Sequence, residues 1–334
     1  MIRVVGLLLL AAVIVLGGTG VWVAYDLDRP GPPRPGPVVI QVEEGERFAE
    51  IARDLNRQGV LRHALPLIVF ARVTGRDRSV HWGEYMITTP LSALNLLDRI
   101  TRRPDPLHQV TVPEGLPVRQ VVRLLSEAGF GSEESFYCVL NDPAFLDSEG
   151  LPPTGAEGYL FPNTYDFPLA TPQERILRTM VKQFREAFGP ELAMRAAALG
   201  FTEQEAVTLA SLVEEEARKP EERRLVAAVF VNRLRRGMPL QSDPTVLYGR
   251  EDEDDRRITR KDLRRRTPFN TYTIPGLPPT PIVNPGRASL EAAVDPAPVD
   301  YLYFVARGDG SHEFTSTLAA HNAAVARHIL NRRR

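Results

Sequence analysis

Apolar residues recur at three- and four-residue steps in several parts of the chain, which predicts amphipathic helices. These steps run through residues 65–73, 91–100, 172–188, 221–236 and 318–330. Alternating apolar and polar residues at 81–87 and 301–306 predict short strands. Thr202 and Glu205 have the spacing of a capping box, which predicts the start of a further helix. The mixture of the two patterns predicts an α+β fold.

An internal repeat divides the first half of the chain. Each copy has a strand-like segment, a Glu-Gly turn and then apolar residues at helical steps. The copies lie 70 residues apart, and their apolar residues are Phe48, Ile51 and Leu55 in the first and Val118, Val121 and Leu125 in the second. We therefore predict two related strand-turn-helix units.

The helix that begins after Thr202 leads into three consecutive glutamates, Glu214, Glu215 and Glu216. At about 100° per residue, Glu216 falls within roughly 60° of Leu209, on the apolar stripe of this helix. The other two glutamates point to different faces. The pattern therefore places Glu216 on the face that is expected to be buried.

A buried carboxyl group favours its neutral form, so its pKa rises. Such a group can hold a proton near neutral pH and give it to a leaving group, which is the task of a general acid. The alternative is that Glu216 lies on the frayed last turn before Pro220 and is solvated, as most glutamates are. Periodicity alone does not decide between these interpretations.

The N-terminus contains an uncharged, mostly apolar run from Val4 to Ala24. At about 1.5 Å per helical residue, a run of this length crosses a hydrocarbon core of roughly 30 Å. Arg3 precedes the run and Asp26 and Asp28 follow it, so the charge bias places the N-terminus in the cytoplasm. We predict a signal anchor at residues 4–25 behind a cytoplasmic stub at 1–3. A cleaved signal peptide is the alternative.

The remaining chain divides at segments rich in proline. Residues 26–37 form a Pro-rich linker, residues 38–106 a small α+β module, and residues 107–334 a larger mixed α+β domain. Trp82 and Tyr85 could stack on a sugar ring, but aromatic residues in short strands more often belong to a core.

Composition excludes several classes of function. The formal net charge is −1, and no basic stripe interleaved with aromatic residues is present, so nucleic-acid binding is not expected. Cys138 is the only cysteine, which rules out an internal disulfide. The chain has no HExxH pattern and no paired cysteines. We therefore expect neither a metal nor another cofactor.

Several motifs, in order along nearly the whole chain, resemble the YceG-like (MltG) family of endolytic murein transglycosylases. The motifs are EGYLFPNTYDF (157–167), ASLVEEEA (210–217), FVNRL (230–234), LQSDPTVLYG (240–249), NTYTIPGLPPTPIVNPG (270–286) and YLYFVARGDGSHEF (301–314). Residues 38–106 look like the LysM-like module of that family, and residues 107–334 like its catalytic domain. Six motifs in the same order make the resemblance specific.

The resemblance implies a single-pass inner-membrane protein whose periplasmic domain cuts nascent peptidoglycan strands internally, between MurNAc and GlcNAc, and leaves 1,6-anhydroMurNAc ends. The family motif places the catalytic glutamate at Glu216, with Glu214 as the second candidate. One acid suffices because the C6 hydroxyl of the sugar itself attacks C1. The implied partners are glycan strands, the membrane and cell-wall synthases.

Five further residues are candidates for substrate binding. Two of them, Gln241 and Asp243, lie in the LQSDPT motif, and three lie in the irregular segment 270–286, which is expected to wall a groove: Asn270, Tyr272 and Asn284. Asp243-Pro244 is equally typical of a turn or a helix start. We expect Tyr165 to pack in the fold and His312 to be a loop contact or a groove wall.

Two alternative functions remain open. One is a muramidase-type hydrolase in which Glu216 is the acid and Asp243 positions a water molecule. The other is a non-catalytic scaffold that binds glycan through the LysM-like module and recruits cell-wall synthases. Replacement of Glu216 by Gln separates catalysis from scaffolding, because the variant keeps the shape of the side chain and loses the acid.

Overall fold

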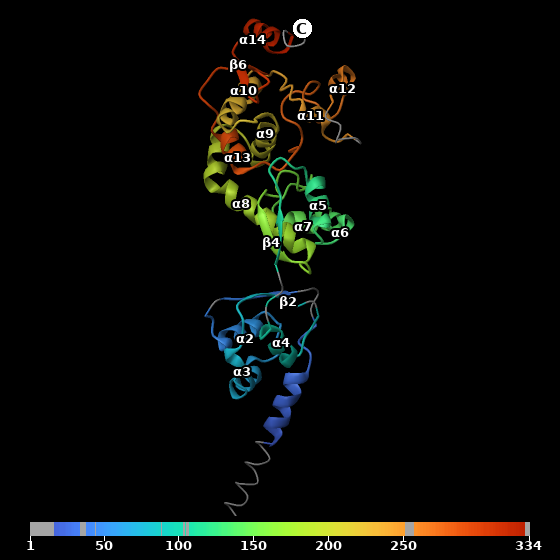
Figure 1. Ribbon diagram of the computed structural model, residues 1–334, viewed down its shortest axis with the longest axis vertical. Coiled ribbons are helices and arrows are strands. Elements are labelled where there is room, and N and C mark those ends of the chain that lie inside the picture. The colour runs from blue at the N-terminus through green and yellow to red at the C-terminus, as the bar shows by residue number, and fades with distance from the viewer. Residues whose placement is uncertain are drawn as a thin grey trace, which may run out of the picture. The chain divides into compact units, whose positions relative to one another are not determined.

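The computed structural model describes residues 17–33, 38–43, 45–87, 89–102, 104, 107–250 and 257–330. The chain divides into two compact units (Figure 1). Unit 1 comprises Met1–His108 with Pro168–Thr171, and unit 2 comprises Gln109–Phe167 with Pro172–Arg334. Most of the predicted signal anchor, at residues 4–16, lies outside the described residues.

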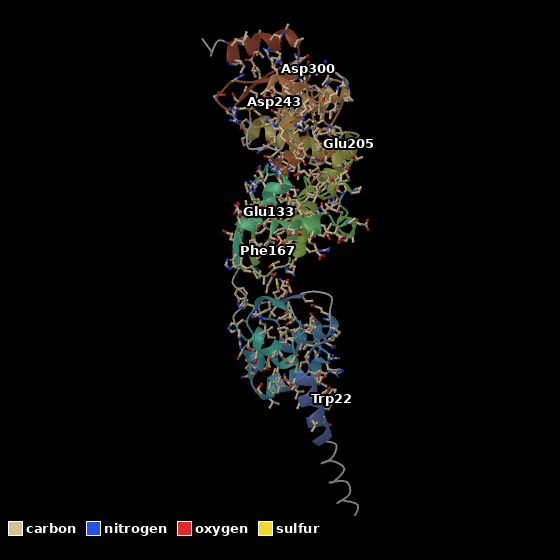
Figure 2. All side chains as sticks on the ribbon, turned by 90° about the vertical axis from the view of Figure 1, so that its right-hand side faces the viewer. Trp22, Glu133, Phe167, Glu205, Asp243 and Asp300 are labelled. Atoms are coloured by element: carbon tan, nitrogen blue, oxygen red, sulfur yellow. The ribbon has the colours of Figure 1, made fainter. Side chains whose placement is uncertain are left out.

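Residues 17–28 are helical, and the last turn of this helix packs on unit 1. Leu27 is buried in the core of that unit. The carboxylate of Asp26 lies 2.8 Å from Nδ1 of His63. Trp22, which is labelled in Figure 2, is exposed, and its ring lies 5.6 Å from the same imidazole. Within the described residues, no helix combines the length and the apolar character that a membrane crossing needs.

Unit 1 is built on a two-stranded antiparallel sheet. Strand β1 (Val38–Val42) pairs with β2 (Gly83–Ile87), and Ile40 faces Tyr85 across the sheet. Besides the helix at 17–28, the described part of this unit contains α2 (Phe48–Arg57), α3 (Ala64–Val73), the 3-10 turn η1 (Arg76–Arg78) and α4 (Ala93–Ile100). The predicted helices at 65–73 and 91–100 and the strand at 81–87 are thus confirmed, with ends shifted by one to two residues.

Tyr85 belongs to the core, as aromatic residues in short strands usually do. Its ring is fully buried, and its hydroxyl group donates to the carbonyl oxygen of His81 at 2.8 Å, with Ile100 O and Arg102 O each at 3.2 Å. Trp82 precedes the strand and is 64% exposed. Of the two aromatic residues, only Tyr85 therefore belongs to the core.

The internal repeat is confirmed as a repeated structure. Helix α5 (Val118–Glu127) has the same length as α2 and begins 70 residues later. The turns before the two helices contain Gly45 and Gly115, both at φ 80°, where a residue with a Cβ atom would be strained. The strands that precede these turns are β1 and β3 (Leu107–Thr111). The positive φ angle therefore explains why both units have a glycine in this turn.

The first part of unit 2 surrounds a two-stranded sheet of β3 and β4 (Thr164–Pro168). Its helices are α5, α6 (Glu133–Leu140), α7 (Pro143–Ser148) and the long α8 (Gln173–Ala198). Helix α8 breaks at Gly189, which has φ 49° and ψ 172° and precedes Pro190. The predicted helix at 172–188 therefore ends where expected, but a second helical segment follows the break directly. Tyr165 is buried, and its hydroxyl donates to Phe161 O at 2.6 Å, so it packs as expected.

The second part of unit 2 has a helical core. Three helices pack on one another there: α9 (Glu203–Glu216), α10 (Arg223–Arg235), which follows the 3-10 turn η2 (Pro220–Glu222), and α13 (Arg287–Val294). The antiparallel pair β5 (Tyr303–Ala306) and β6 (His312–Thr315) packs beside α10. The chain continues into α14 (Leu318–Val325) and the π-helical turn η3 (Ala326–Leu330). These elements match the predicted helices at 221–236 and 318–330 and the strand at 301–306.

Two short helices, α11 (Pro244–Leu247) and α12 (Arg260–Arg264), lie between α10 and α13. Residues 251–256, inside the charged segment between these helices, lie outside the described residues. Residues 265–286 form turns and bends without a helix or a strand. This confirms the irregular segment expected at 270–286.

Candidate active site

Helix α9 carries the candidate acid on its last residue, Glu216. The helix begins with the predicted capping box: Thr202 accepts from the Glu205 amide at 3.2 Å, and Glu205 accepts from the Thr202 amide at 2.8 Å. Every residue from Ala206 to Val213 is buried. This part of the helix is therefore buried on all sides. The prediction of a single buried stripe is wrong, because the other faces of the helix are buried as well.

Glu216 lines a cavity of about 320 Å³ in unit 2. The wall comes from the end of α9, from α10, from the strands β5 and β6 and from the loops around α11. The other lining residues are Arg233, Leu240, Gln241, Asp243, Tyr272, Phe304, Val305, Ala306, His312 and His321. Glu216 is partly exposed to this cavity rather than fully solvated, so the structure favours the buried interpretation over the solvated one.

The Glu216 carboxyl group is held by two donors on one loop. Oγ of Ser242 donates to Oε1 at 2.7 Å, and the backbone N–H of Asp243 also bonds this carboxyl group. Burial raises the pKa of Glu216 to about 7, and the negative charges of Asp243 and Glu215 add to the rise, while the two hydrogen bonds oppose it. The group can therefore both hold and release a proton near neutral pH.

Three of the five predicted binding residues lie in the same wall. Gln241, Asp243 and Tyr272 line the cavity with Glu216. The Tyr272 hydroxyl donates to Oδ1 of Asp243 at 2.7 Å, and burial together with this bond raises the pKa of Tyr272. Gln241 has φ 55°, an uncommon value for a residue with a side chain. Such a backbone position is often found at functional sites.

The other two predicted binding residues, Asn270 and Asn284, are fully buried and do not line the cavity. The Asn270 amide donates to Arg265 O at 2.6 Å. Asn284 donates to Leu116 O at 2.8 Å and accepts from the Leu160 amide at 2.9 Å. Their amide groups thus satisfy buried backbone groups, a geometry that braces the loops rather than presenting the amides to a substrate.

Glu214, the second candidate for the acid, faces a different part of the fold. Its side chain is only 8% exposed, and Oε2 accepts from the Gly286 amide at 2.9 Å, just before α13. Oε1 lies 3.6 Å from Nη2 of Arg223. Glu214 therefore joins α9 to the start of α13 and does not line the Glu216 cavity.

Arg233 and Ser242 belong to the site although the sequence did not mark them as candidates. Arg233 is buried, donates to Leu240 O at 2.8 Å and to Leu302 O at 2.7 Å, and lies 5.2 Å from the centre of the Tyr303 ring. A signal for it existed, because Arg233 is a charged residue within the apolar pattern of residues 221–236. No periodic signal marks Ser242, which is found only through its bond to Glu216.

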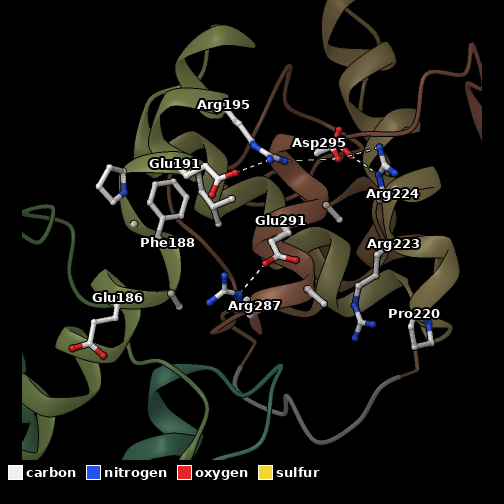
Figure 3. A pocket seen from close by; sticks show the side chains of 16 residues that line it. Glu186, Phe188, Glu191, Arg195, Pro220, Arg223, Arg224, Arg287, Glu291 and Asp295 are labelled. Atoms are coloured by element: carbon white, nitrogen blue, oxygen red, sulfur yellow. Dashed lines mark hydrogen bonds and ion pairs between the residues drawn. The ribbon is translucent and has the colours of Figure 1, made fainter.

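A larger cavity of about 610 Å³ lies in unit 2, beside the break in α8 (Figure 3). It contains four arginines, and each has a carboxylate partner: Arg195 with Glu191, Arg224 with Asp295, Arg287 with Glu291, and Arg223 with Glu214 and Glu114. The charges in its wall thus compensate one another. The smaller Glu216 cavity is the better candidate because it contains a carboxyl group with a strongly shifted pKa.

Among the residues that the structure describes, no three His, Cys, Asp or Glu side chains are grouped so that they could hold a metal ion. The wall of the Glu216 cavity presents carboxyl, imidazole, hydroxyl, amide and guanidinium groups to a ligand.

Comparisons with known proteins agree with the motifs. The chain is 32% identical over 311 residues to an endolytic murein transglycosylase of Bacillus subtilis (strain 168), an alignment that covers 87% of this chain and 85% of that protein. It is 29% identical over 323 residues to an endolytic murein transglycosylase of Streptococcus pneumoniae serotype 2, covering 87% of this chain and 58% of that protein.

A solved structure is similar over most of the chain. The crystal structure of a YceG-like protein from Listeria monocytogenes superposes with a TM-score of 0.59 and 27% sequence identity, covering 86% of this chain and 99% of that one. The sequence model of the YceG-like family matches residues 40–327, a range that contains the whole cavity wall. The chain therefore belongs to the YceG-like family.

Proposed function

We propose that the protein is an endolytic murein transglycosylase with Glu216 as its catalytic acid. The relatives from Bacillus subtilis and Streptococcus pneumoniae carry that name. The observation that carries the assignment is a single one: a partly buried carboxyl group, with a pKa near 7, in the wall of an open cavity. The substrate is peptidoglycan, and the bond that breaks joins MurNAc to GlcNAc.

The reaction needs one proton donor and no water. Glu216 gives its proton to the glycosidic oxygen, the bond from C1 to that oxygen breaks, and the C6 hydroxyl oxygen of MurNAc forms a new bond to C1. The C6 hydroxyl loses its proton in the same process, so the product is a 1,6-anhydro ring. In the one-acid scheme the Glu216 carboxylate is the group that takes this second proton.

The surroundings of Glu216 suit both stages of this reaction. Burial keeps the carboxyl group protonated before the bond breaks, because the neutral form is favoured away from water. After proton transfer the carboxylate is stabilised by the hydroxyl of Ser242, by the Asp243 amide and by the nearby charge of Arg233. The same loop thus holds the group in both charge states.

The test is digestion of purified murein sacculi by the wild-type chain and by Glu216→Gln, followed by mass spectrometry of the products. The wild type should release fragments with 1,6-anhydroMurNAc ends, and the variant should release almost none. The Gln side chain keeps the size of Glu and can still accept from Ser242, so the loss reports the missing proton. Reducing ends in the wild-type digest would contradict the transglycosylase assignment.

A muramidase-type hydrolase remains the alternative, because Asp243 lies in the same cavity and could activate a water molecule. The two reactions give products that differ by one water molecule. Asp243→Asn also separates them: it should abolish hydrolysis, whereas a transglycosylase should retain part of its turnover. In the transglycosylase the Asp243 carboxylate raises the pKa of Glu216 and accepts a hydrogen bond from Tyr272. It takes part in neither proton transfer.

We further propose that residues 4–25 anchor the protein in the inner membrane and that the chain after this anchor faces the periplasm. The uncharged run supports this proposal, as do the exposed apolar side chains of Val21, Trp22 and Tyr25, since aromatic residues are enriched at membrane interfaces. Residues 38–106 would act as a LysM-like module that binds glycan, and cell-wall synthases would be partners. Glycan lengths in cells that carry Glu216→Gln test the scaffold alternative, which predicts no change.

A further inference from the structure

A second pair of titratable side chains, Glu222 and His312, contributes one residue, His312, to the wall of the Glu216 cavity. Glu222 ends the η2 turn before α10, and His312 is the first residue of β6. Nδ1 of His312 lies 2.7 Å from Oε2 of Glu222, and the His312 amide donates to Oε1 of the same carboxylate at 2.9 Å. The side chains are only 10% and 9% exposed. The one-acid scheme gives this pair no task.

The contacts of Glu222 determine how the imidazole presents itself to the cavity. A carboxylate accepts hydrogen bonds, so Nδ1 carries the hydrogen in the neutral ring and Nε2 has a free lone pair. Nε2 has no hydrogen-bond partner among the residues that the structure describes, and His312 lines the cavity. The rings of Phe304 and Phe314, with centres 5.3 and 6.1 Å away, hold the imidazole plane in place. A fixed acceptor therefore lies in the cavity that holds Glu216.

We propose that His312 accepts the proton of the C6 hydroxyl group and that Glu222 positions it for this step. The proposal rests on the transglycosylase function above and assigns its second proton transfer. The proton of the hydroxyl passes to Nε2 while O6 bonds to C1, and the departing oxygen takes the proton of Glu216 with the electron pair of the broken bond. The imidazolium lies against the Glu222 carboxylate and returns its proton to Glu216 after the product leaves.

The physical reason is that the one-acid scheme requires Glu216 to give one proton and to accept another in the same process. While Glu216 still holds its proton for the glycosidic oxygen, it is a poor acceptor for a second one. A neutral imidazole with a free Nε2 removes the conflict, because the acid and the base are then separate groups. A carboxylate that bonds the other ring nitrogen both selects the tautomer and stabilises the imidazolium that forms.

Asparagine and glutamine substitutions separate this role from a structural one. In His312→Asn the amide occupies the place of Nδ1 and keeps the bond to Glu222, but no group remains at the place of Nε2. We expect kcat on purified glycan strands to fall about 10²-fold, with KM changed by less than about twofold. A merely structural histidine would tolerate this change, and turnover within twofold of wild type would overturn the proposal.

Glu222→Gln tests the tautomer. The amide of Gln can accept from the His312 backbone only if its NH₂ group faces Nδ1, which must then accept. The hydrogen moves to Nε2, which becomes a donor, so kcat should fall as in His312→Asn while the cavity keeps its shape. His328→Gln is the matched control, because Nε2 of His328 also contacts a carboxylate, Glu313, at 2.7 Å, but the pair does not line the cavity.

Nitrogen-15 NMR of the wild-type chain labelled at histidine provides a measurement that does not depend on whether a variant folds. The proposal requires a His312 ring with hydrogen on Nδ1 and none on Nε2. A ring protonated at Nε2 in the neutral form would overturn it. If the wild type itself yields no anhydro ends, the proposed function fails. If anhydro ends form equally fast without Nε2, only the role of His312 fails.

Discussion

At the scale of single residues, the proposed role of Glu216 as the acid predicts the pH range of activity. Burial raises the pKa of this acid to about 7, and only the protonated form can give a proton to the glycosidic oxygen. We therefore expect kcat/KM to fall tenfold per pH unit above about 7. A pH profile between 5 and 9 measures the fall, and a profile that stays flat to pH 9 would contradict the role of Glu216.

Two neighbours of Glu216 should shift the alkaline limb of the pH profile, which is the fall of kcat/KM above about pH 7, in opposite directions. The Ser242 hydroxyl stabilises the carboxylate, so Ser242→Ala should raise the pKa of Glu216 and shift the limb to higher pH. The negative charge of Asp243 raises that pKa, so Asp243→Asn should shift the limb to lower pH. Both variants should also lower the maximal rate, but the position of the limb is the measurement. Shifts in the same direction would exclude this electrostatic account.

The same carboxyl group should weaken the fold at alkaline pH. Because its pKa rises from 4.5 to about 7 on folding, its contribution to stability is full below about 4.5 and is lost as the pH rises through about 7. Glu216→Gln has no charge to bury, so its free energy of unfolding should exceed that of wild type by roughly 1–3 kcal/mol at pH 8. Thermal melts at pH 4 and pH 8 check this, since the difference should nearly vanish at pH 4, below both pKa values.

At this scale the useful signal in the sequence is a residue that breaks a pattern. Glu216 is a charged residue among apolar positions and lies in the cavity wall, and Arg233 gives the same signal. Asn270 and Asn284 were placed in the right loop but given the wrong environment, because polarity alone does not show whether an amide faces a cavity or buried backbone groups. Ser242 lies in the LQSDPT motif, but the sequence does not reveal its bond to Glu216, which is 26 residues away.

At the scale of elements, Glu214 and Glu216 lie at the same end of α9 but have different surroundings: Glu214 bonds the start of α13, and Glu216 lines the cavity. Glu214→Ala leaves the Gly286 amide without this acceptor and weakens the pairing of Arg223, so it should cost about 1–3 kcal/mol of unfolding free energy. Urea denaturation measures this cost. Glu186→Ala is the control, because its ion pair with Lys182 is exposed and 3.8 Å long, and its loss should cost less than about 1 kcal/mol.

Elements were predictable wherever the local pattern was strong. The repeat gave both strand-turn-helix units, because the apolar steps and the Glu-Gly turn recur at one offset. Helix α9 was predicted with its cap, but its burial on all sides was not, since Thr208 and Ser211 look polar in the sequence. Each satisfies its hydroxyl on a backbone carbonyl one turn away, Gln204 O at 2.7 Å and Thr208 O at 2.7 Å.

At the scale of the whole molecule, the helix at 17–28 should serve both anchoring and folding, and the two tasks can be separated. Removal of residues 1–16 should release the protein from the membrane fraction and leave the melting temperature unchanged, because Asp26 and Leu27 remain packed on unit 1. Leu27→Ala in the full chain should stay in the membrane fraction but lose about 2–4 kcal/mol of stability, the cost of emptying a buried leucine site. Carbonate extraction measures the membrane attachment of each variant, and thermal melts measure its stability. If the shortened chain stays in the membrane, another surface holds it there, and the proposed anchor at 4–25 must be given up as the cause.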